Sequence, residues 1–319
     1  MSITKRIDAI TLIPEERLRC DPPAPRSVKI ELTGRCNYRC SFCALRSRPS
    51  QPAGDMDFKL FTRITQEMRE AGVEEIGLFF LGESFMAKQL LCNAVWFLKH
   101  QMPNPMPYVF LTTNGSLADP HTVDDLMAAG LDSLKWSINA ADAEQFAQIM
   151  QVKPALWEQS LQNLRWAREV RDANKYATRI YASSIKYDGA QHDQMERLLR
   201  ERVRPYVDEH YWLPLYSMGA VATQREEALG YKPIAGNQGR IGALRDPLPC
   251  WSVATEGHVT SYGMLSACCF DADGRFAMAD LNEVSFMSGW HSQKFQELRK
   301  AHFAKNVKGT VCENCIAYQ

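Results

Sequence analysis

The sequence predicts an α/β protein in which parallel strands alternate with helices, followed by a smaller cysteine-rich region. Apolar runs with strand character alternate with amphipathic helical runs from residue 27 to residue 213, an order typical of parallel β/α units. The chain of 319 residues is 45% apolar, which is enough to bury the core of one large or two smaller domains.

Residues 1–26 form a short extension whose Pro-Pro-Ala-Pro run cannot continue a helix. Six strands and five helices follow it in alternation. Their predicted ranges are 27–33, 75–81, 107–113, 132–138, 177–186 and 206–213 for the strands, and 57–71, 87–100, 120–129, 153–172 and 190–203 for the helices.

We divide the chain into an extension (1–26), an α/β domain (27–214), a linker or lid rich in Gly, Pro and polar residues (215–249) and a C-terminal domain (250–319). Within the last domain, residues 261–263 are typical of a hairpin tip, and residues 285–303 predict one helix after a serine cap. His291 and His302 are expected on the surface of that helix.

Charge and hydropathy exclude several classes of partner. The chain has 37 basic and 37 acidic residues and no Lys/Arg block, so neither nucleic acid nor an anionic membrane is expected as a partner. It also lacks a long apolar run and an N-terminal apolar export segment. We therefore expect a cytoplasmic protein that acts on a small or peptidic substrate.

Three cysteines follow the first predicted strand in the run Cys-Asn-Tyr-Arg-Cys-Ser-Phe-Cys: Cys36, Cys40 and Cys43. Three thiolates can hold three irons of a four-iron cluster, and the fourth iron then stays open for a cofactor or substrate. The alternatives are a zinc site or unconnected core thiols.

This spacing resembles the cluster motif of the radical S-adenosylmethionine (radical SAM) superfamily, and Phe42 stands where that family usually has an aromatic residue. The resemblance implies a partial (β/α)6 barrel with its active site at the carboxyl ends of the strands. It also implies a [4Fe-4S] cluster that binds S-adenosylmethionine (SAM), a 5'-deoxyadenosyl radical that abstracts hydrogen from substrate, and a reductant protein such as flavodoxin or ferredoxin.

Polar residues at the ends of later strands resemble the tracts that surround SAM in this family. Gly82 and Glu83 match part of a Gly-Gly-Glu motif, in which Leu81 replaces the first glycine. The alternative for these positions is ordinary βα turns. The resemblance assigns SAM contacts to Phe42, Gly82, Glu83, Thr113, Asn114, Ser137 and Asn139, the last of which replaces a common aspartate.

A second group of cysteines lies near the C-terminus and comprises Cys250, Cys268, Cys312 and Cys315. Four thiolates make a closed site. The pattern resembles the twitch domain, a shorter relative of the SPASM domain, and this resemblance implies a second, auxiliary [4Fe-4S] cluster. A zinc ribbon is the alternative.

The leading interpretation is dehydrogenation of a small polar molecule, such as a sugar or aminocyclitol, with the auxiliary cluster as electron acceptor. One alternative is a radical epimerase in which Cys269 returns a hydrogen atom, although Cys269 could simply pack. Others are a peptide maturase of the RiPP type and, as non-enzymes, an iron-sulfur electron carrier or a zinc-stabilised binding protein.

The base for dehydrogenation is not identified by any motif. His258 and Glu256 are candidates because they precede the hairpin tip near the second cysteine group, and a solvated hairpin is the other interpretation. Candidate substrate contacts are Tyr211, Trp212, Tyr216, Arg240 and Arg245.

Overall fold

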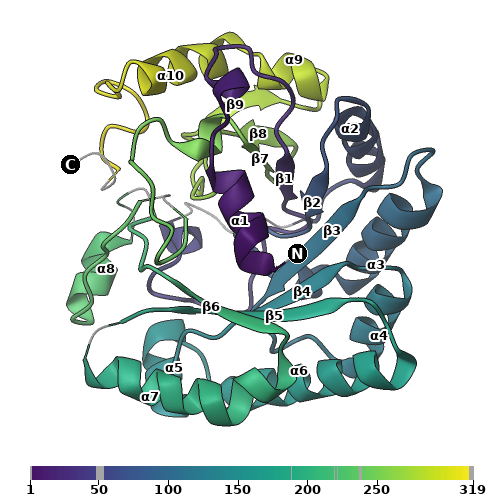
Figure 1. Ribbon diagram of the computed structural model, residues 1–319, viewed down its shortest axis with the longest axis vertical. Coiled ribbons are helices and arrows are strands. Elements are labelled where there is room, and N and C mark those ends of the chain that lie inside the picture. The colour runs from purple at the N-terminus through teal and green to yellow at the C-terminus, as the bar shows by residue number, and fades with distance from the viewer. Residues whose placement is uncertain are drawn as a thin grey trace.

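The computed structural model describes residues 2–47, 54–187, 189–218, 220, 222–236 and 239–315. Within these residues one mixed sheet of nine strands has the order β6-β5-β4-β3-β2-β1-β7-β8-β9. The sheet curves around a central space and helices cover its outer face (Figure 1). Four positions of the expected linker, residues 219, 221, 237 and 238, lie outside the described residues.

The six predicted strands are confirmed, with ends a few residues inside the predicted ranges at most positions. All six are parallel to their neighbours. They are β1 (Ser27–Ile30), β2 (Glu75–Gly77), β3 (Tyr108–Thr113), β4 (Ser133–Ser137), β5 (Arg179–Ile185) and β6 (Glu209–Leu213).

The five predicted helices are confirmed as well. Asp57 and Asp119 cap the first and third of them by accepting backbone N–H groups, which satisfies donors that a helix start otherwise leaves open. They are α2 (Phe58–Glu70), α3 (Lys88–Trp96), α4 (Pro120–Ala128), α6 (Ala155–Asn174) and α7 (Ala190–Leu198); wider turns continue α3 through Phe97–Gln101 and α7 through Leu199–Val203.

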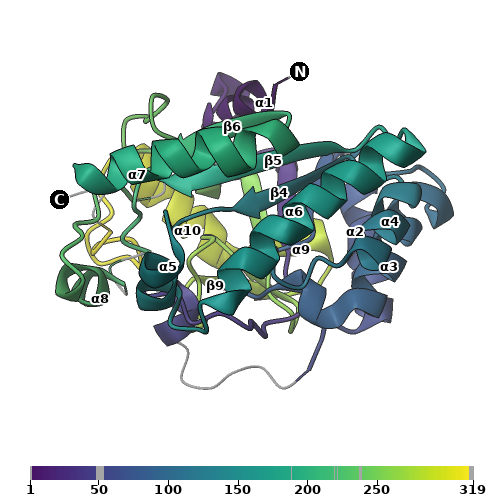
Figure 2. The same cartoon turned by 90° about the horizontal axis from the view of Figure 1, so that it is seen from below.

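Side chains along each strand point alternately to the outer core and to the inner space. Val28 and Ile30 are fully buried in the core that also contains α2, whereas Lys29 between them lines the inner cavities. Figure 2 shows α6 and α7 over the outer face of β4, β5 and β6. The inner face is therefore free to carry polar side chains.

The sheet continues into the C-terminal region. β7 (Glu256–Val259) pairs in parallel with β1, and a hairpin at Gly263, whose φ is +86°, leads to the antiparallel β8 (Met264–Ser266) and then β9 (Ala277–Asp280). The predicted hairpin tip is thus confirmed. The cysteine-rich region is joined to the parallel sheet by backbone hydrogen bonds.

Residues 285–303 form two helices where the sequence predicted one. These are α9 (Phe286–Trp290) and α10 (Gln293–Phe303), capped by Ser285 and Ser292 respectively. Ser292 ends the first helix and starts the second because its side chain accepts the N–H of Phe295. Both helices cover the outer face of the C-terminal strands (Figure 1).

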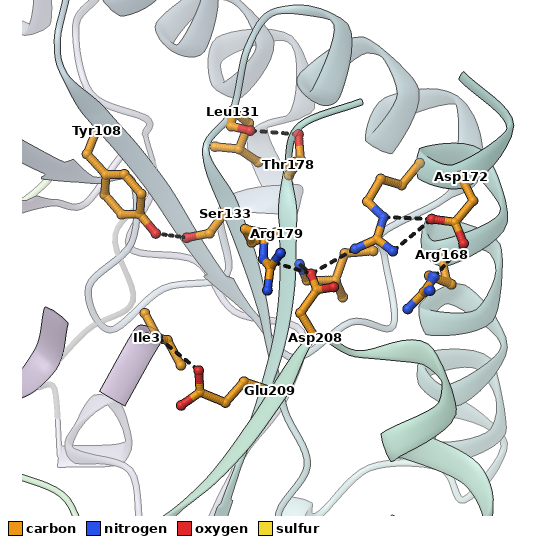
Figure 3. Close-up of polar contacts among 12 residues, drawn as sticks. Ile3, Tyr108, Leu131, Ser133, Arg168, Asp172, Thr178, Arg179, Asp208 and Glu209 are labelled. Atoms are coloured by element: carbon orange, nitrogen blue, oxygen red, sulfur yellow. Dashed lines mark hydrogen bonds and ion pairs between the residues drawn. The ribbon is translucent and has the colours of Figure 1, made fainter. Parts of the chain in front are cut away.

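The N-terminal extension contains a helix that the sequence analysis missed. α1 (Ile3–Thr11) lies inside the curve of the sheet, on the opposite side of β5 and β6 from α6 and α7 (Figures 1 and 2). Its first turn is held by Glu209, which accepts the N–H of Ile3 at 3.0 Å (Figure 3) and the hydroxyl of Thr4 at 2.7 Å. Arg6 forms an ion pair with Glu75.

Two further helices were also missed, α5 (Ala143–Met150) and α8 (Thr223–Ala228). No helix among the described residues is both long and apolar enough to span a membrane.

Candidate functional site

A cavity of about 310 Å³ lies where the parallel strands end, and it brings the first cysteine group and the expected SAM contacts together. Cys36, Cys40 and Cys43 reach it from the loop after β1. The seven expected SAM contacts also line it: Phe42, Gly82, Glu83, Thr113, Asn114, Ser137 and Asn139.

The three thiols influence one another through their proximity. Burial raises the pKa of Cys36 to about 12, with Glu83 and Cys43 adding to the effect. Burial also raises the pKa of Cys40 well above its ordinary value, and Cys43 and Cys36 raise it further. Such thiols become thiolates when a cation compensates their charge. The donor set therefore suits an iron-sulfur cluster, whose usual ligands are thiolates.

The loop that carries these cysteines is fixed from the linker. Arg225, on α8, donates from its guanidinium to the carbonyl oxygens of Ser41 at 2.9 Å and Cys43 at 3.0 Å. Ser41 in turn donates its hydroxyl to Glu226 at 2.9 Å. The linker thus positions the loop that carries the three cysteines. The sequence alone did not indicate this role.

Gly82 lies where the chain after β2 passes close to the loop after β1. Its N–H donates to Glu31 at 3.1 Å, and a Cβ on Gly82 would lie 1.9 Å from the carbonyl oxygen of Thr33. No side chain larger than hydrogen fits there without a shift of backbone. Glycine at this position is therefore required by the close approach of the two loops.

Glu83 links the ends of two neighbouring strands. Its carboxylate accepts the Thr113 hydroxyl at 2.8 Å, the Asn114 N–H at 2.7 Å and the Phe85 N–H at 3.2 Å. Burial raises the pKa of Glu83 although these hydrogen bonds act in the opposite direction. The carboxylate thus holds the cavity wall in place while it faces the cavity.

The polar groups further along the wall also have defined partners. Asn114 donates its side-chain N–H to Asn37 at 2.8 Å, and Asn139 accepts the N–H of Ile185 at 3.0 Å. These bonds fix the orientation of both amides, which is a requirement for selective contacts with a ligand.

A second cavity of about 220 Å³ adjoins the first and extends toward α1. Ile3 and Arg6 of α1 and Tyr108 of β3 are part of its wall. Of the expected substrate contacts, Tyr211, Tyr216 and Arg240 line this deeper cavity, whereas Trp212 and Arg245 do not. Residues common to both cavities are Lys29, Phe79, Thr112, Leu213, Tyr216, Cys269 and Phe270.

Cys269 and His258, the two expected catalytic residues, have different positions. Cys269 lines both cavities. His258 is fully buried, is not among the described residues that line either cavity, and has Nε2 2.8 Å from Glu256. Lys29 donates to the same carboxylate at 2.8 Å. Burial opposes the ionisation of Glu256, but Lys29 and His258 lower its pKa below the ordinary value.

The cysteines of the second group lie close enough to influence one another. Burial raises the pKa of Cys312, and nearby Cys250 and Cys315 raise it further. Cys268 has a raised pKa to which Cys269, burial and Cys250 contribute. Among the described residues, no three His, Cys, Asp or Glu side chains already stand close enough to hold a single metal ion.

The two cysteine groups meet at a small apolar cluster. Cys36 and Cys43 from the first group, Cys268 from the second, and its neighbour Cys269 all pack against it. Its buried members are Ala44, Leu45, Leu81, Phe270 and Ala272.

His302 corrects the expectation of a surface histidine. It is fully buried, accepts the N–H of Cys250 at Nδ1 (3.2 Å), and places Nε2 3.4 Å from Sγ of Cys312. The spacing of Phe295, Leu298 and His302, all on the buried face of α10, was the signal that could have found it.

Comparison with known proteins agrees with this geometry. Residues 30–180 match the family model of the Radical SAM superfamily, and residues 250–316 match that of SPASM, an iron-sulfur cluster-binding domain. The GTP 3',8-cyclase of Synechococcus sp. (strain CC9902) is 25% identical over 285 residues, which cover 77% of this chain and 80% of the cyclase.

Two crystal structures show the same fold. BtrN in complex with AdoMet and 2-DOIA aligns with a TM-score of 0.57 and 18% identity, covering 91% of this chain and 92% of BtrN. Streptococcus suis SuiB bound to precursor peptide SuiA aligns with a TM-score of 0.65 and 14% identity, covering 93% of this chain and 71% of SuiB.

Proposed function

Because the chain is an enzyme of the radical SAM superfamily with a C-terminal SPASM domain, we propose that it dehydrogenates a small polar substrate such as a sugar or aminocyclitol. The two domains imply SAM and iron-sulfur clusters as cofactors. The observation that carries the proposal is the pair of adjoining cavities, one with the SAM-type wall and the other of small-molecule size with several charged side chains in a largely apolar wall.

We assign the first cluster to Cys36, Cys40 and Cys43, and SAM to the cavity wall that contains Gly82 and Glu83. When bound there, cluster and SAM supply the 5'-deoxyadenosyl radical that takes a hydrogen atom from the substrate. Gly82 lets this part of the wall pass directly beside the carbonyl oxygen of Thr33, where a Cβ would not fit. Glu83 adds a carboxylate suited to an ammonium group.

The deeper cavity favours a small molecule over a peptide. Its volume of about 220 Å³ is below the range typical of drug-sized ligands. The aromatic faces of Tyr108, Tyr181 and Tyr211 and several charged groups line it, a combination that suits a compact ring bearing hydroxyl or amino groups.

We assign an auxiliary four-iron cluster to Cys250, Cys268, Cys312 and Cys315, as the electron acceptor. The shared apolar cluster supports this role because it brings the two cysteine groups to one region of the molecule. Four protein ligands would leave this second cluster closed to substrate.

Epimerisation is the second candidate function, and the position of Cys269 favours it. The thiol lines both cavities, as a donor of a hydrogen atom to a substrate radical must. In D₂O an epimerase would place solvent deuterium on the substrate carbon, whereas a dehydrogenase would release a product that lacks two hydrogens. Cys269→Ala would abolish the product of the epimerase while SAM cleavage continues.

The proposed function is tested with reduced, anaerobically reconstituted protein, SAM, and glucose, glucosamine or inositol deuterated at carbon. Transfer of deuterium into 5'-deoxyadenosine, with a carbonyl product, is the expected result. If deuterium reaches 5'-deoxyadenosine only when deuterated peptides replace these small molecules, peptide maturation would replace the proposal. Absence of SAM cleavage under all these conditions would contradict the enzyme assignment and favour an electron carrier.

A further inference from the structure

Lys135 is a lysine of β4 whose side chain lines the deeper cavity. The strand alternates, so that Leu134 and Trp136 are buried in the outer core while Ser133 and Lys135 face the cavity. Nothing in the sequence motifs singled this residue out.

Lys135 is the cation of this cavity that lacks an acidic partner. Each of the other three has one: Arg6 pairs with Glu75, Lys29 with Glu256 at 2.8 Å, and Arg240 with Asp8 at 2.7 Å. No described residue forms an ion pair or hydrogen bond with the side chain of Lys135, and its Nζ lies 5.6 Å from the centroid of the Tyr211 ring. A buried ammonium without a counter-charge is costly, so the neutral amine is favoured.

Both effects of the surroundings on the pKa of Lys135 lower it. Burial, followed by the positive charge of Lys29, lowers the pKa of Lys135 to about 7. A substantial fraction is then a free amine near neutral pH, which suits a lysine to accept protons. The charged and titratable groups that share its cavity are Arg6, Lys29, Glu75, Tyr108, Tyr181, Tyr211, Tyr216, Arg240, Glu256 and Cys269.

We propose that the amine of Lys135 is the general base that takes the proton from the substrate's hydroxyl or amino group. The inference rests on the dehydrogenation proposed above. Glu256 and His258 are less suited to this role because the carboxylate is shared by Lys29 and His258, and His258 lies outside the cavity walls.

The atoms and electrons balance for an alcohol. The carbon that bears the hydroxyl group loses its hydrogen atom to the 5'-deoxyadenosyl radical. The O–H bond of that hydroxyl group then breaks. Its proton passes to Nζ of Lys135 and its electron pair stays on oxygen. One electron leaves the resulting radical anion for an acceptor of the iron-sulfur class, and a carbon–oxygen double bond remains.

The first test needs no substrate. Brief labelling of the holoenzyme with acetic anhydride over a range of pH, followed by mass spectrometry, gives the fraction of each lysine present as free amine. Lys135 should show a midpoint near pH 7, and the exposed Lys59 serves as the control that shows the reagent is active at each pH. A midpoint near 10 for Lys135, or no labelling of it at any pH, would overturn the proposal.

The second test separates proton transfer from hydrogen abstraction. Lys135→Met and Lys135→Arg are compared with wild type on whichever of deuterated glucose, glucosamine or inositol labels 5'-deoxyadenosine. Deuterium transfer should persist in both variants while formation of the carbonyl product falls about 100-fold or more. Iron content and the melting temperature confirm that each variant is folded.

Lys135→Arg distinguishes a base from a mere cation, since arginine keeps the charge and does not accept a proton. Product formation at the wild-type rate in either variant would refute the role of Lys135. If wild type transfers deuterium from no probe, the proposed function fails, and the labelling midpoint still decides whether Lys135 is an available base.

Discussion

The position of the SAM cavity wall depends on a few close contacts of individual residues. Gly82 leaves no room for a Cβ beside the carbonyl oxygen of Thr33, and Glu83 collects three donors from two neighbouring loops. These contacts place the cavity wall at the ends of β2 and β3.

Gly82→Ala is expected to destabilise the protein by roughly 2–3 kcal/mol and to weaken SAM binding, because the backbone must move to admit the methyl group. Urea denaturation and isothermal titration with SAM measure the two effects. Gly54→Ala is the control, since no atom lies within 4 Å of its added Cβ. Equal stability and SAM affinity of Gly82→Ala and wild type would contradict the close approach.

Lys135 should leave a signature in the pH dependence of stability. Its pKa of about 7 in the folded protein lies below the value of about 10 for an unfolded chain. Between these values the unfolded chain binds a proton that the folded protein lacks, so this residue makes stability rise with pH. Lys135→Met should therefore stabilise the protein at about pH 6 and lose this advantage by about pH 10.

Urea denaturation of wild type and Lys135→Met at several pH values measures this difference in the free energy of unfolding. A difference that stays constant from about pH 6 to 10 would show that Lys135 titrates normally.

For single residues, the sequence predicts those functional positions that a local motif holds together. The spacing of Cys36, Cys40 and Cys43 led to the cavity because a short loop holds them together. Lys135 and His302 were missed because their importance depends on neighbours remote in sequence. Among the described residues no carboxylate pairs with Lys135, and His302 accepts the N–H of Cys250.

Among the elements, α1 has the least expected position. It lies within the curve of the sheet (Figure 1). Its Ile3 and Arg6 are part of the wall of the deeper cavity. Glu209 accepts hydrogen bonds from the first turn of α1, one of them drawn in Figure 3, and Ile3 and Ile7 add apolar contacts with the strands.

Glu209→Ala is expected to loosen α1 and cost about 1–2 kcal/mol of stability, since it removes an anion from a helix N-terminus and leaves N–H donors without their acceptor. Hydrogen exchange of residues 3–11 should become faster. Glu196→Ala, which breaks a solvent-exposed pair with Arg204, should change stability by less than about 0.5 kcal/mol. Unchanged exchange in Glu209→Ala would show that other contacts hold α1.

Alternation of apolar runs predicted the six strands β1 to β6 because each βα unit is built from local sequence. The break at Ser292 was missed since one helical pattern spans both α9 and α10. α1 was missed because its apolar face is short: Ile3 becomes buried, and Ile7 partly buried, only against the distant strands β5 and β6.

The whole molecule joins two cysteine groups that are far apart in sequence. The parallel pairing of β7 with β1 carries the second group to the first, and both pack on one apolar cluster. Sequence indicated each group by its spacing. It could not indicate their proximity, because no local pattern specifies which strand β7 joins.

The central claim is that this molecule holds two four-iron clusters, one at each cysteine group. The most direct measurement is iron and acid-labile sulfide per chain after anaerobic reconstitution, in wild type and in two multiple Cys→Ala variants. One variant lacks Cys36, Cys40 and Cys43, and the other lacks Cys250, Cys268, Cys312 and Cys315. We predict about eight irons in wild type and about four in each variant. About four irons in wild type and none in the first variant, with zinc at the second group, would contradict the claim and remove the proposed electron acceptor.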